Sequence, residues 1–250
     1  AKLDKPTAVA NQSFTYTGNV QEFLLTGVNE SLMIVTDNKQ TNADTYTVTV
    51  SIKDQYIANY EWNDVDQTNP TFNFIIKQAD IDKVTVTGLE DLVYTAANIT
   101  VNPVLTFNGN TVDSSNYSYK VMFNDAESSI LNAGNYTLVI TGDKNFTGTK
   151  EVLFNVAPAQ ATVTDFVGET IVLGQSHNIK PTVIGINGVD LSDDITLVYT
   201  NEAGESTTSI PSTSGVYKVT ILIDNYTTDA YVELTILNKV PVYVEVSDPN

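Results

Sequence analysis

The chain lacks cysteine and arginine entirely and holds a single histidine. Without cysteine there can be no disulfide, no thiolate nucleophile and no cysteine-based zinc site. A Ser-His-Asp arrangement needs a positioned histidine, but His177 stands in a polar segment and no nucleophile elbow occurs, so we interpret it as a surface-turn residue. No P-loop, dinucleotide-binding fingerprint or HExxH motif is present either. The sequence therefore predicts no enzyme, no catalytic residue and no metal ligand.

Positive charge is also scarce. Twelve lysines face 30 aspartates and glutamates, which gives a formal net charge of −18. A surface of this charge repels polyanions, so we expect no nucleic-acid partner and no attraction to an anionic membrane. There is no signal peptide and no apolar run of about 18 residues, so we expect no membrane insertion. We interpret the charge as a solubility feature of a protein that works at high salt or outside the cell.

The abundant residues are those of strands and turns. The chain contains 34 threonines and 25 asparagines, with 42% apolar and 9% aromatic residues. Threonine, valine, isoleucine and tyrosine suit pleated, half-buried strands, and asparagine, aspartate and glycine suit the turns between them. No long stretch has an apolar period of 3.6 residues. The composition therefore predicts an all-β protein.

Internal similarity organises the sequence. A small turn residue followed two positions later by tyrosine and an alternating strand occurs at Tyr46, Tyr136 and Tyr217, which are 90 and 81 positions apart. Three further landmarks recur in the same order, which indicates a repeated unit of about 80–90 residues. They are an asparagine-aromatic pair (Asn59-Tyr60, Asn145-Phe146, Asn225-Tyr226), a closing strand (72–76, 152–156, 232–236) and an early segment (16–18, 94–96 and, more degraded, 172–174).

Each unit has the pattern of a β-sandwich. After Tyr46, the residues Val48, Val50 and Ile52 share one strand face while threonine and serine occupy the other, so one face packs on a core and the other meets water. A tyrosine at such a corner can bury its ring and return its hydroxyl to the backbone a few residues upstream. We therefore assign Tyr46, Tyr136 and Tyr217 a structural, tyrosine-corner-like role, and expect the asparagine-aromatic pair at the turn before the closing strand.

The spacing divides the chain into domains. We predict immunoglobulin-like repeats at 1–80, 81–158 and 159–240, the last divergent, followed at 241–250 by a linker or the start of a further repeat. The junctions near 77–82 and 157–161 contain only a few residues. Such short connections favour an extended array over independently moving domains.

The second unit resembles a known family along nearly its whole length. Its residues 94–96, 116–119, 132–136 and 142–149, together with the closing 154–156, follow the pattern of bacterial immunoglobulin-like repeats (MBG-type and related) of Gram-positive surface and adhesin-like proteins. The first unit is similar at 16–18, 59–62 and 76–79; the third keeps 180–181, 215–217 and 225–226 but lacks the glycine after its aromatic residue. The resemblance implies a stalk or adhesion module on a bacterial cell surface and transfers no ligand-binding residue.

Acidic clusters are the candidates for a cofactor. Oxygen-rich loops bind Ca²⁺ in many extracellular modules, but none of these clusters has the spacing of an EF-hand. We therefore favour solvated acidic turns, keep Ca²⁺ as the alternative, and expect no other cofactor. Paired carboxylates could also hydrolyse a glycosidic bond, but a repeat of this size offers no deep substrate cleft. The clusters are Asp190 with Asp193 and Asp194, Asp125 with Glu127, and Asp64 with Asp66.

Two further side-chain arrangements have a structural and a functional interpretation. Trp62, beside Tyr60, could form a sugar-stacking platform, but we favour the view that it covers the end of the sandwich core. Cysteine-free bacterial sandwiches sometimes carry a Lys–Asn isopeptide bond beside a buried acid, and Lys180 and Glu233 are the partners to inspect. Such a bond would lower the intact mass by about 17 Da, through loss of ammonia on amide formation.

The sequence thus favours a non-catalytic, extracellular repeat segment that acts as a stalk or adhesion module. The alternative is a module that binds carbohydrate or a host protein through loops between strands, and an accessory domain of an enzyme comes third. A host or cell-surface protein or a glycan would be the partner, and we expect a monomer. The sequence assigns no ligand-binding residue.

Overall fold

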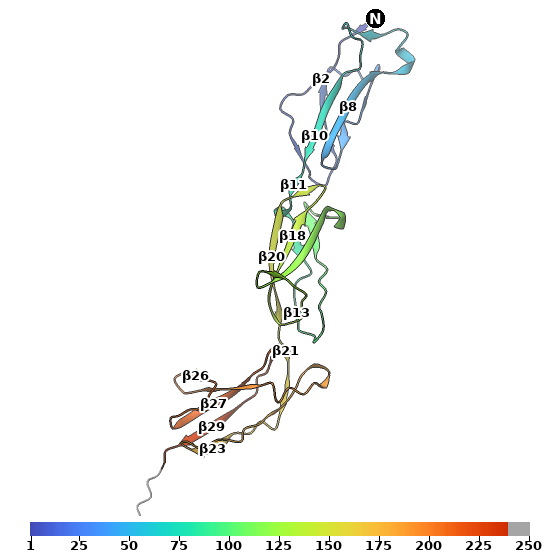
Figure 1. The fold of residues 1–250 in the computed structure, drawn as a ribbon. Helices are drawn as coiled ribbons and strands as arrows, with labels where there is room; N and C mark the ends of the chain where they lie inside the picture. The colour runs from blue at the N-terminus through green and yellow to red at the C-terminus, as the bar shows by residue number, and fades with distance from the viewer. Residues whose placement is uncertain (240–250) are drawn as a thin grey trace, which may run out of the picture. The chain divides into compact units, whose positions relative to one another are not determined.

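The computed structural model describes residues 1–239 of the chain. The predicted linker or opening strand at 241–250 lies outside the described residues. The protein is all-β, with short 3-10 turns and no α-helix in the described part, and its strands form three successive groups of the same kind, as expected for three tandem immunoglobulin-like domains (Figure 1). No helix within residues 1–239 is long and apolar enough to cross a membrane.

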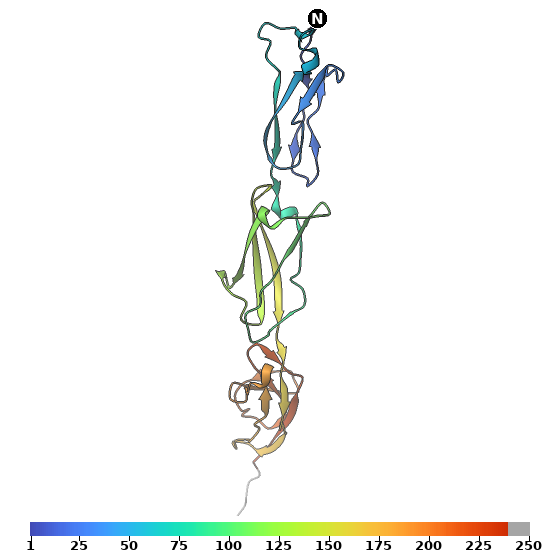
Figure 2. The same cartoon turned by 90° about the vertical axis from the view of Figure 1, so that its right-hand side faces the viewer.

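The first group contains a four-stranded sheet in the order β3-β10-β8-β6. The strands β8 and β10 pair antiparallel and lie side by side, and β3 joins β10 in parallel (Figure 1). The 3-10 turn η1 lies near the N-terminus of the chain (Figure 2). The elements are β1 (Lys2–Leu3), β2 (Thr7–Ala8), β3 (Phe14–Thr15), β4 (Gln21–Glu22), β5 (Leu25–Thr26), β6 (Met33–Thr36), β7 (Lys39–Gln40), β8 (Asp44–Ile52), η1 (Asp54–Tyr56), β9 (Glu61–Trp62) and β10 (Thr71–Lys77).

The second group repeats this plan with a five-stranded sheet in the order β13-β20-β18-β16-β17 and a smaller sheet β12-β14-β15. Its early strand again pairs in parallel with its closing strand, through Leu92 opposite Val156. The elements are β11 (Ala79–Asp80), η2 (Ile81–Lys83), β12 (Thr85–Thr87), β13 (Leu92–Val93), β14 (Val104–Phe107), β15 (Asn110–Thr111), η3 (Ser114–Asn116), β16 (Tyr117–Phe123), β17 (Ala126–Glu127), β18 (Gly134–Gly142), β19 (Phe146–Thr147) and β20 (Thr149–Ala157).

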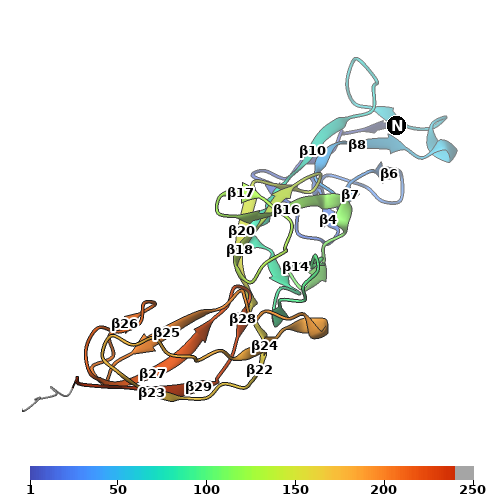
Figure 3. The ribbon, with the colours of Figure 1, turned by 60° about the horizontal axis from the view of Figure 1, so that its bottom comes forward.

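The third group has the sheet order β23-β29-β27-β25-β26, and these strands lie side by side in Figure 3. Here the parallel pair of early and closing strands is longer and runs from Glu169 opposite Leu234 to Val172 opposite Leu237. The elements are β21 (Ala159–Gln160), β22 (Thr162–Thr164), β23 (Glu169–Val172), β24 (Thr182–Ile184), η4 (Ile186–Gly188), β25 (Thr196–Thr200), β26 (Ser206–Thr207), β27 (Gly215–Leu222), β28 (Tyr226–Thr227) and β29 (Tyr231–Leu237).

The core follows from the alternation of the central strands. Val48 and Val50 are fully buried and Ile52 nearly so, as their common strand face predicts. In β18 the same face presents Leu138 and Ile140, both fully buried. Burying side chains of this size contributes about 1.5–3 kcal/mol each, so this stripe is the main apolar contribution of each central strand.

By its internal contacts, the chain divides into two compact units. One contains Ala1–Leu89, Val101–Ser128 and Tyr136–Phe154, and the other contains Glu90–Thr100, Ser129–Asn135 and, among the described residues, 155–239. Strands β18 and β20 have residues in both units. The first unit therefore includes the connection from the first group of strands to the second, and the second unit includes the connection to the third. The predicted boundaries at 80, 158 and 240 stay a prediction.

Candidate functional sites: the corner tyrosines, the joints and the Trp62 end

The three corner tyrosines lie on the central strands and face the cores. The hydroxyl of Tyr46 donates to the backbone carbonyl of Asn42 at 3.0 Å, four residues upstream, and that of Tyr217 donates to the carbonyl of Thr213 at 3.1 Å. Tyr136 is 2% exposed, and its ring stacks on Phe154 with centroids 5.6 Å apart. Burial, and then the charge of Asp44, raises the pKa of Tyr46, so its hydroxyl stays protonated as a donor.

A joint connects the first group of strands to the second, and Asn145 is its centre. The side-chain Oδ1 of Asn145 accepts from the backbone amide of Ala43 at 2.7 Å, and its Nδ2 donates to Oδ1 of Asn42 at 3.1 Å. The same Nδ2 donates to Oδ1 of Asn116 at 2.9 Å, and the Asn145 carbonyl accepts from the amide of Ala79 at 2.9 Å. Asn145 is 8% exposed, so these bonds satisfy a buried amide that would otherwise be costly. We call this contact the first joint.

Aromatic rings complete the first joint. Tyr16, at the end of β3, meets Phe146 edge-on with ring centroids 5.2 Å apart and lies parallel to Phe107 at 6.1 Å. Phe107 and Phe146 in turn meet edge-on at 5.1 Å. Edge-to-face pairs of this kind are worth about 0.5–1.5 kcal/mol beyond the area they bury. The aromatic residue of the Asn145-Phe146 pair therefore packs on the preceding group of strands while the asparagine binds its corner.

The second joint repeats this geometry in the other compact unit. Oδ1 of Asn225 accepts from the amide of Ala133 at 2.7 Å, and its Nδ2 donates to Oδ1 of Asn132 at 3.2 Å. Tyr94 meets Tyr226 edge-on with centroids 5.3 Å apart. The Asn225 carbonyl accepts from the amide of Ala159 at 3.0 Å, as the Asn145 carbonyl does from Ala79.

The sequence located these motifs without pairing them. It placed the asparagine-aromatic pair at the turn before the closing strand, and β19 and β28 lie there. It did not predict that the asparagine binds the Asn-Ala corner of the preceding group of strands, which lies 102 residues away in the first joint and 92 in the second. The sequence did contain a signal for this pairing. Both joints combine the same two residue pairs, Asn-Ala at the corner and asparagine followed by an aromatic residue at the turn.

One early segment is offset from its prediction. The amide of Tyr16 donates to the carbonyl of Lys77, and that of Tyr94 to the carbonyl of Ala157. In the third group the equivalent donor to Leu237 is Leu173, not Val172. The alignment by residue type matched Val172 to Tyr16 and Tyr94, whereas the backbone pairing shows that Leu173 is their equivalent.

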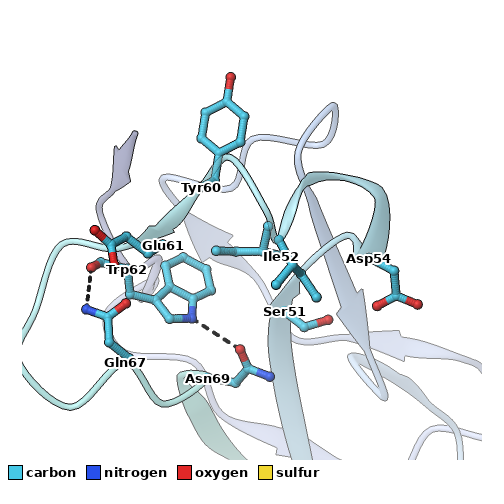
Figure 4. A pocket seen from close by; sticks show the side chains of 9 residues that line it. Ser51, Ile52, Asp54, Tyr60, Glu61, Trp62, Gln67 and Asn69 are labelled. Carbon is cyan, nitrogen blue, oxygen red and sulfur yellow. Dashed lines mark hydrogen bonds between the residues drawn. The ribbon is translucent and has the colours of Figure 1, made fainter.

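Trp62 lies at the end of the first group nearest the N-terminus. It is 2% exposed and packs with Met33, Val50 and Ile52. Its indole Nε1 donates to Oδ1 of Asn69 at 3.1 Å, and Gln67 donates to its backbone carbonyl at 2.7 Å (Figure 4). The prediction that Trp62 covers the core is confirmed, because a ring this deeply buried offers no face for a sugar. A pocket beside the indole is lined by polar groups that include Ser51, Asp54, Glu61, Gln67 and Asn69.

Three carboxylates of the acidic clusters have protein partners, those of Asp64, Asp66 and Asp190. Lys5 forms ion pairs with Asp64 and, at 2.8 Å, with Asp66, and its hydrogen bond is the main cause that lowers the Asp66 pKa to about 2. Asp190 accepts from the amide and hydroxyl of Ser192, which lowers its pKa. Within residues 1–239, no three histidine, aspartate or glutamate side chains gather closely enough to hold a metal ion.

Two sequence interpretations need correction. His177 is half-buried rather than on a surface turn, because its Nε2 bonds the hydroxyl of Tyr199 and its Nδ1 accepts from the Ile179 amide at 3.2 Å. Lys180 and Glu233 are both exposed, so neither provides the buried environment that an isopeptide bond requires. The buried polar side chains of the described chain are the two asparagines of the first joint, Asn116 and Asn145.

The comparisons with known proteins are distant. No family model and no curated protein matches the chain. Among solved structures, extracellular domains 3–5 of Drosophila OTK match at 11% identity and a TM-score of 0.23, over 96% of this chain and 94% of that one. Extracellular cadherin domains 3–6 of protocadherin gamma B2 match at 10% and 0.20, over 95% and 70%. Immunoglobulin domains 1–5 of Sidekick-1 match at 12% and 0.20, over 93% and 59%. The chain is thus similar to tandem immunoglobulin and cadherin arrays, at TM-scores too low for us to base a conclusion on the likeness.

Proposed function

We propose that the chain is a non-catalytic spacer in a stalk or adhesion region outside the cell. The observation that carries this proposal is the joint, which is built twice from the same residue types and distances. A chain of domains that only needed to be connected would have no use for an asparagine that both donates and accepts across the connection, as the buried Asn145 and the half-buried Asn225 do. Each joint instead opposes movement between neighbouring groups of strands, which is what a spacer requires.

The finer assignment is to the bacterial immunoglobulin-like repeats (MBG-type and related) of Gram-positive cell-surface proteins. The residues that carry the resemblance include one half of each joint, namely the turn at 142–149 in the first joint and the corner at 132–136 in the second. The absence of cysteine favours an exported bacterial chain, or an intracellular one, over a disulfide-bonded eukaryotic one, and the net charge of −18 suits a protein that works outside the cell. Weak multivalent contacts to a host or surface partner are compatible with this role.

The binding-module alternative has less support from the surface. A glycan-binding platform needs adjacent exposed rings, whereas the strongly exposed aromatic residues within 1–239 are Tyr119 and Tyr231. The Tyr119 hydroxyl donates to the carbonyl of Val101, and the Tyr231 ring lies under the ammonium of Lys218 at 4.5 Å. Tyr119 and Tyr231 lie on different groups of strands, so each of these groups carries a single strongly exposed ring.

Two measurements test the spacer. Small-angle scattering of the wild-type chain and of the double variant Asn145→Ala/Asn225→Ala should show a broader distribution of interdomain distances in the variant, with Asn155→Ala as the control. A glycan and host-protein array, run with and without Ca²⁺, should show no selective binding. Selective binding that is lost in Tyr231→Ala would instead establish the binding module, and unchanged scattering in the double variant would remove the basis of the spacer.

A further inference from the structure

The tip of the β14–β15 hairpin is an exposed Asn108-Gly109 pair. Phe107 pairs with Asn110, so Asn108 and Gly109 are the two loop residues, and their φ angles are +49° and +81°. A two-residue loop with positive φ at both positions is a type I′ turn, which asparagine followed by glycine suits best. The turn therefore accounts for the presence of these two residues, and their adjacency also makes the asparagine chemically reactive.

This tip contacts the first group of strands at the first joint. Nδ2 of Asn108 donates to the backbone carbonyl of Thr17 at 3.1 Å, although the two residues are 91 positions apart. A Cβ placed on Gly18 would lie 3.2 Å from Nδ2 of Asn110, so the tip packs closely on this segment. The ring of Phe107, immediately before the tip, belongs to the aromatic cluster of the joint. Asn108 is therefore a side chain of the joint that water can reach.

An asparagine that precedes glycine can react with its own backbone, because glycine has no Cβ to hinder the approach. The backbone nitrogen of Gly109 attacks Cγ of Asn108. The new C–N bond closes a cyclic imide, and the proton of that nitrogen leaves with Nδ2 as ammonia. Water then opens the imide at either carbonyl and produces aspartate or isoaspartate. The reaction needs no reactant other than water.

In the folded chain this reaction competes with the bond to Thr17. Cγ of Asn108 must turn onto the nitrogen of Gly109, so Nδ2 has to leave the Thr17 carbonyl first. An aspartate formed here is ionised at neutral pH and can only accept hydrogen bonds. Its carboxylate would face the Thr17 carbonyl, which is also an acceptor, so the contact between the tip and the first group of strands would be lost.

We propose that Asn108 is a deamidation site, that the first joint controls the rate of the reaction, and that the product weakens the joint. Opening of the joint frees the amide for attack, and the attack removes a bond that would close the joint again. A transient movement is thereby made permanent.

A second Asn-Gly pair provides an internal comparison in the third group of strands. Asn187 and Gly188 are both exposed and both have positive φ, at +59° and +75°. The Asn187 side chain makes no hydrogen bond to any of the described residues 1–239. Its rate of deamidation should therefore be independent of the first joint.

Peptide mapping by mass spectrometry tests the site during incubation at mildly alkaline pH, continued until a synthetic peptide of residues 104–112 has reacted. Asn108 and Asn187 should both be converted, whereas Asn73, an exposed asparagine followed by phenylalanine, should stay intact. In Asn145→Ala the rate at Asn108 should rise about fivefold, the factor that one net hydrogen bond is worth, while the rate at Asn187 stays the same. Asn42→Ala, which removes one bond of the same joint, replaces Asn145→Ala if circular dichroism shows that the latter is unfolded. An intact Asn108 in the folded joint variant, or a rate equal to that of the wild type, would overturn the proposal.

The variant Asn108→Asp tests the consequence, because Asp-Gly fits the same turn and only the donor is lost. Hydrogen exchange of the Tyr16 amide, which donates to the carbonyl of Lys77 beside the joint, should become about fivefold faster than in the wild type. Asn187→Asp adds the same charge to the third group of strands and should leave that amide unchanged. Equal exchange in the two variants would show that the bond to Thr17 does not hold the joint, and the proposal would fail.

Discussion

Replacing Asn145 with alanine removes the centre of the first joint. The substitution deletes the hydrogen bonds that Nδ2 donates to Asn42 and Asn116, and it leaves the amide of Ala43 without its acceptor. A net hydrogen bond contributes about 1 kcal/mol, and an unsatisfied buried group costs about 1–3 kcal/mol. Asn116 is itself buried and loses a partner. We therefore expect the free energy of unfolding to fall by about 2–4 kcal/mol.

Two readouts locate the effect. Urea denaturation followed by the fluorescence of Trp62, which is the sole tryptophan and lies in the first group of strands, reports the stability of that group. Hydrogen exchange of the Ala43 amide reports the joint directly, because that amide donates to the deleted oxygen. In the variant this amide should exchange much faster, while amides in the middle of β8 keep most of their protection.

Asn155→Ala is the matched control. Its Nδ2 also makes two hydrogen bonds, to the carbonyl of Gly134 and to Oδ1 of Asn135, but on the exposed face of β20. An exposed substitution of this kind should change stability by no more than about 0.5 kcal/mol. If Asn145→Ala behaved like the control, or if the Ala43 amide stayed protected in it, the joint would not be the stabilising contact inferred from its geometry.

Three other perturbations have defined outcomes. Tyr94→Ala should lower the free energy of unfolding by about 2–3 kcal/mol, because a half-buried ring leaves its place against Tyr226, and thermal melts in which it matched the wild type would contradict the second joint. Trp62→Phe should cost about 2–3 kcal/mol by circular dichroism in urea, since the bond to Asn69 is lost and the smaller ring leaves part of the buried site unfilled; a cost near zero would mean that neither the bond nor the packing of the indole persists in solution. The pKa of Asp66 is lowered from 3.8 to about 2, chiefly by Lys5, so its stabilising contribution is complete above about pH 4 and disappears as the pH falls through about 2. NMR titration should find that midpoint, and Lys5→Met should move it up towards 3.8, whereas an unshifted midpoint in the wild type would show that the ion pair does not persist in solution.

Periodicity predicted the parts of the fold that local sequence controls. The alternation after Tyr46 identified β8 and its buried face, because a period of two fixes which side chains point inward. The recurrence of the corner and closing strands predicted three groups of strands before any pairing was known. A lone tryptophan in a polar segment was correctly interpreted as core cover, since a ring of that size gains most by burial.

The long-range contacts that form the joints could not be predicted from the sequence. Asn145 and Ala43 are 102 positions apart, and nothing in either segment alone specifies the other as its partner. The offset at Leu173 arose because the early segments were aligned by residue type, whereas the backbone register with Leu237 determines which side chain reaches the joint position. The half-buried state of His177 depends on its contact with Tyr199, which lies 22 residues away on β25, and no local sequence pattern predicts that contact.

The asparagine-aromatic turn occurs at the same place in all three groups of strands, and the Asn-Ala corner occurs at the same place in the first two. Any group that keeps both can follow or precede any other group that keeps them. We therefore expect that inserting or deleting a whole unit between such groups leaves the joint contacts intact. The third group has Thr213 and Ser214 in place of the Asn-Ala corner, so we expect a unit inserted after it to form a weaker joint than one inserted after the first or second group.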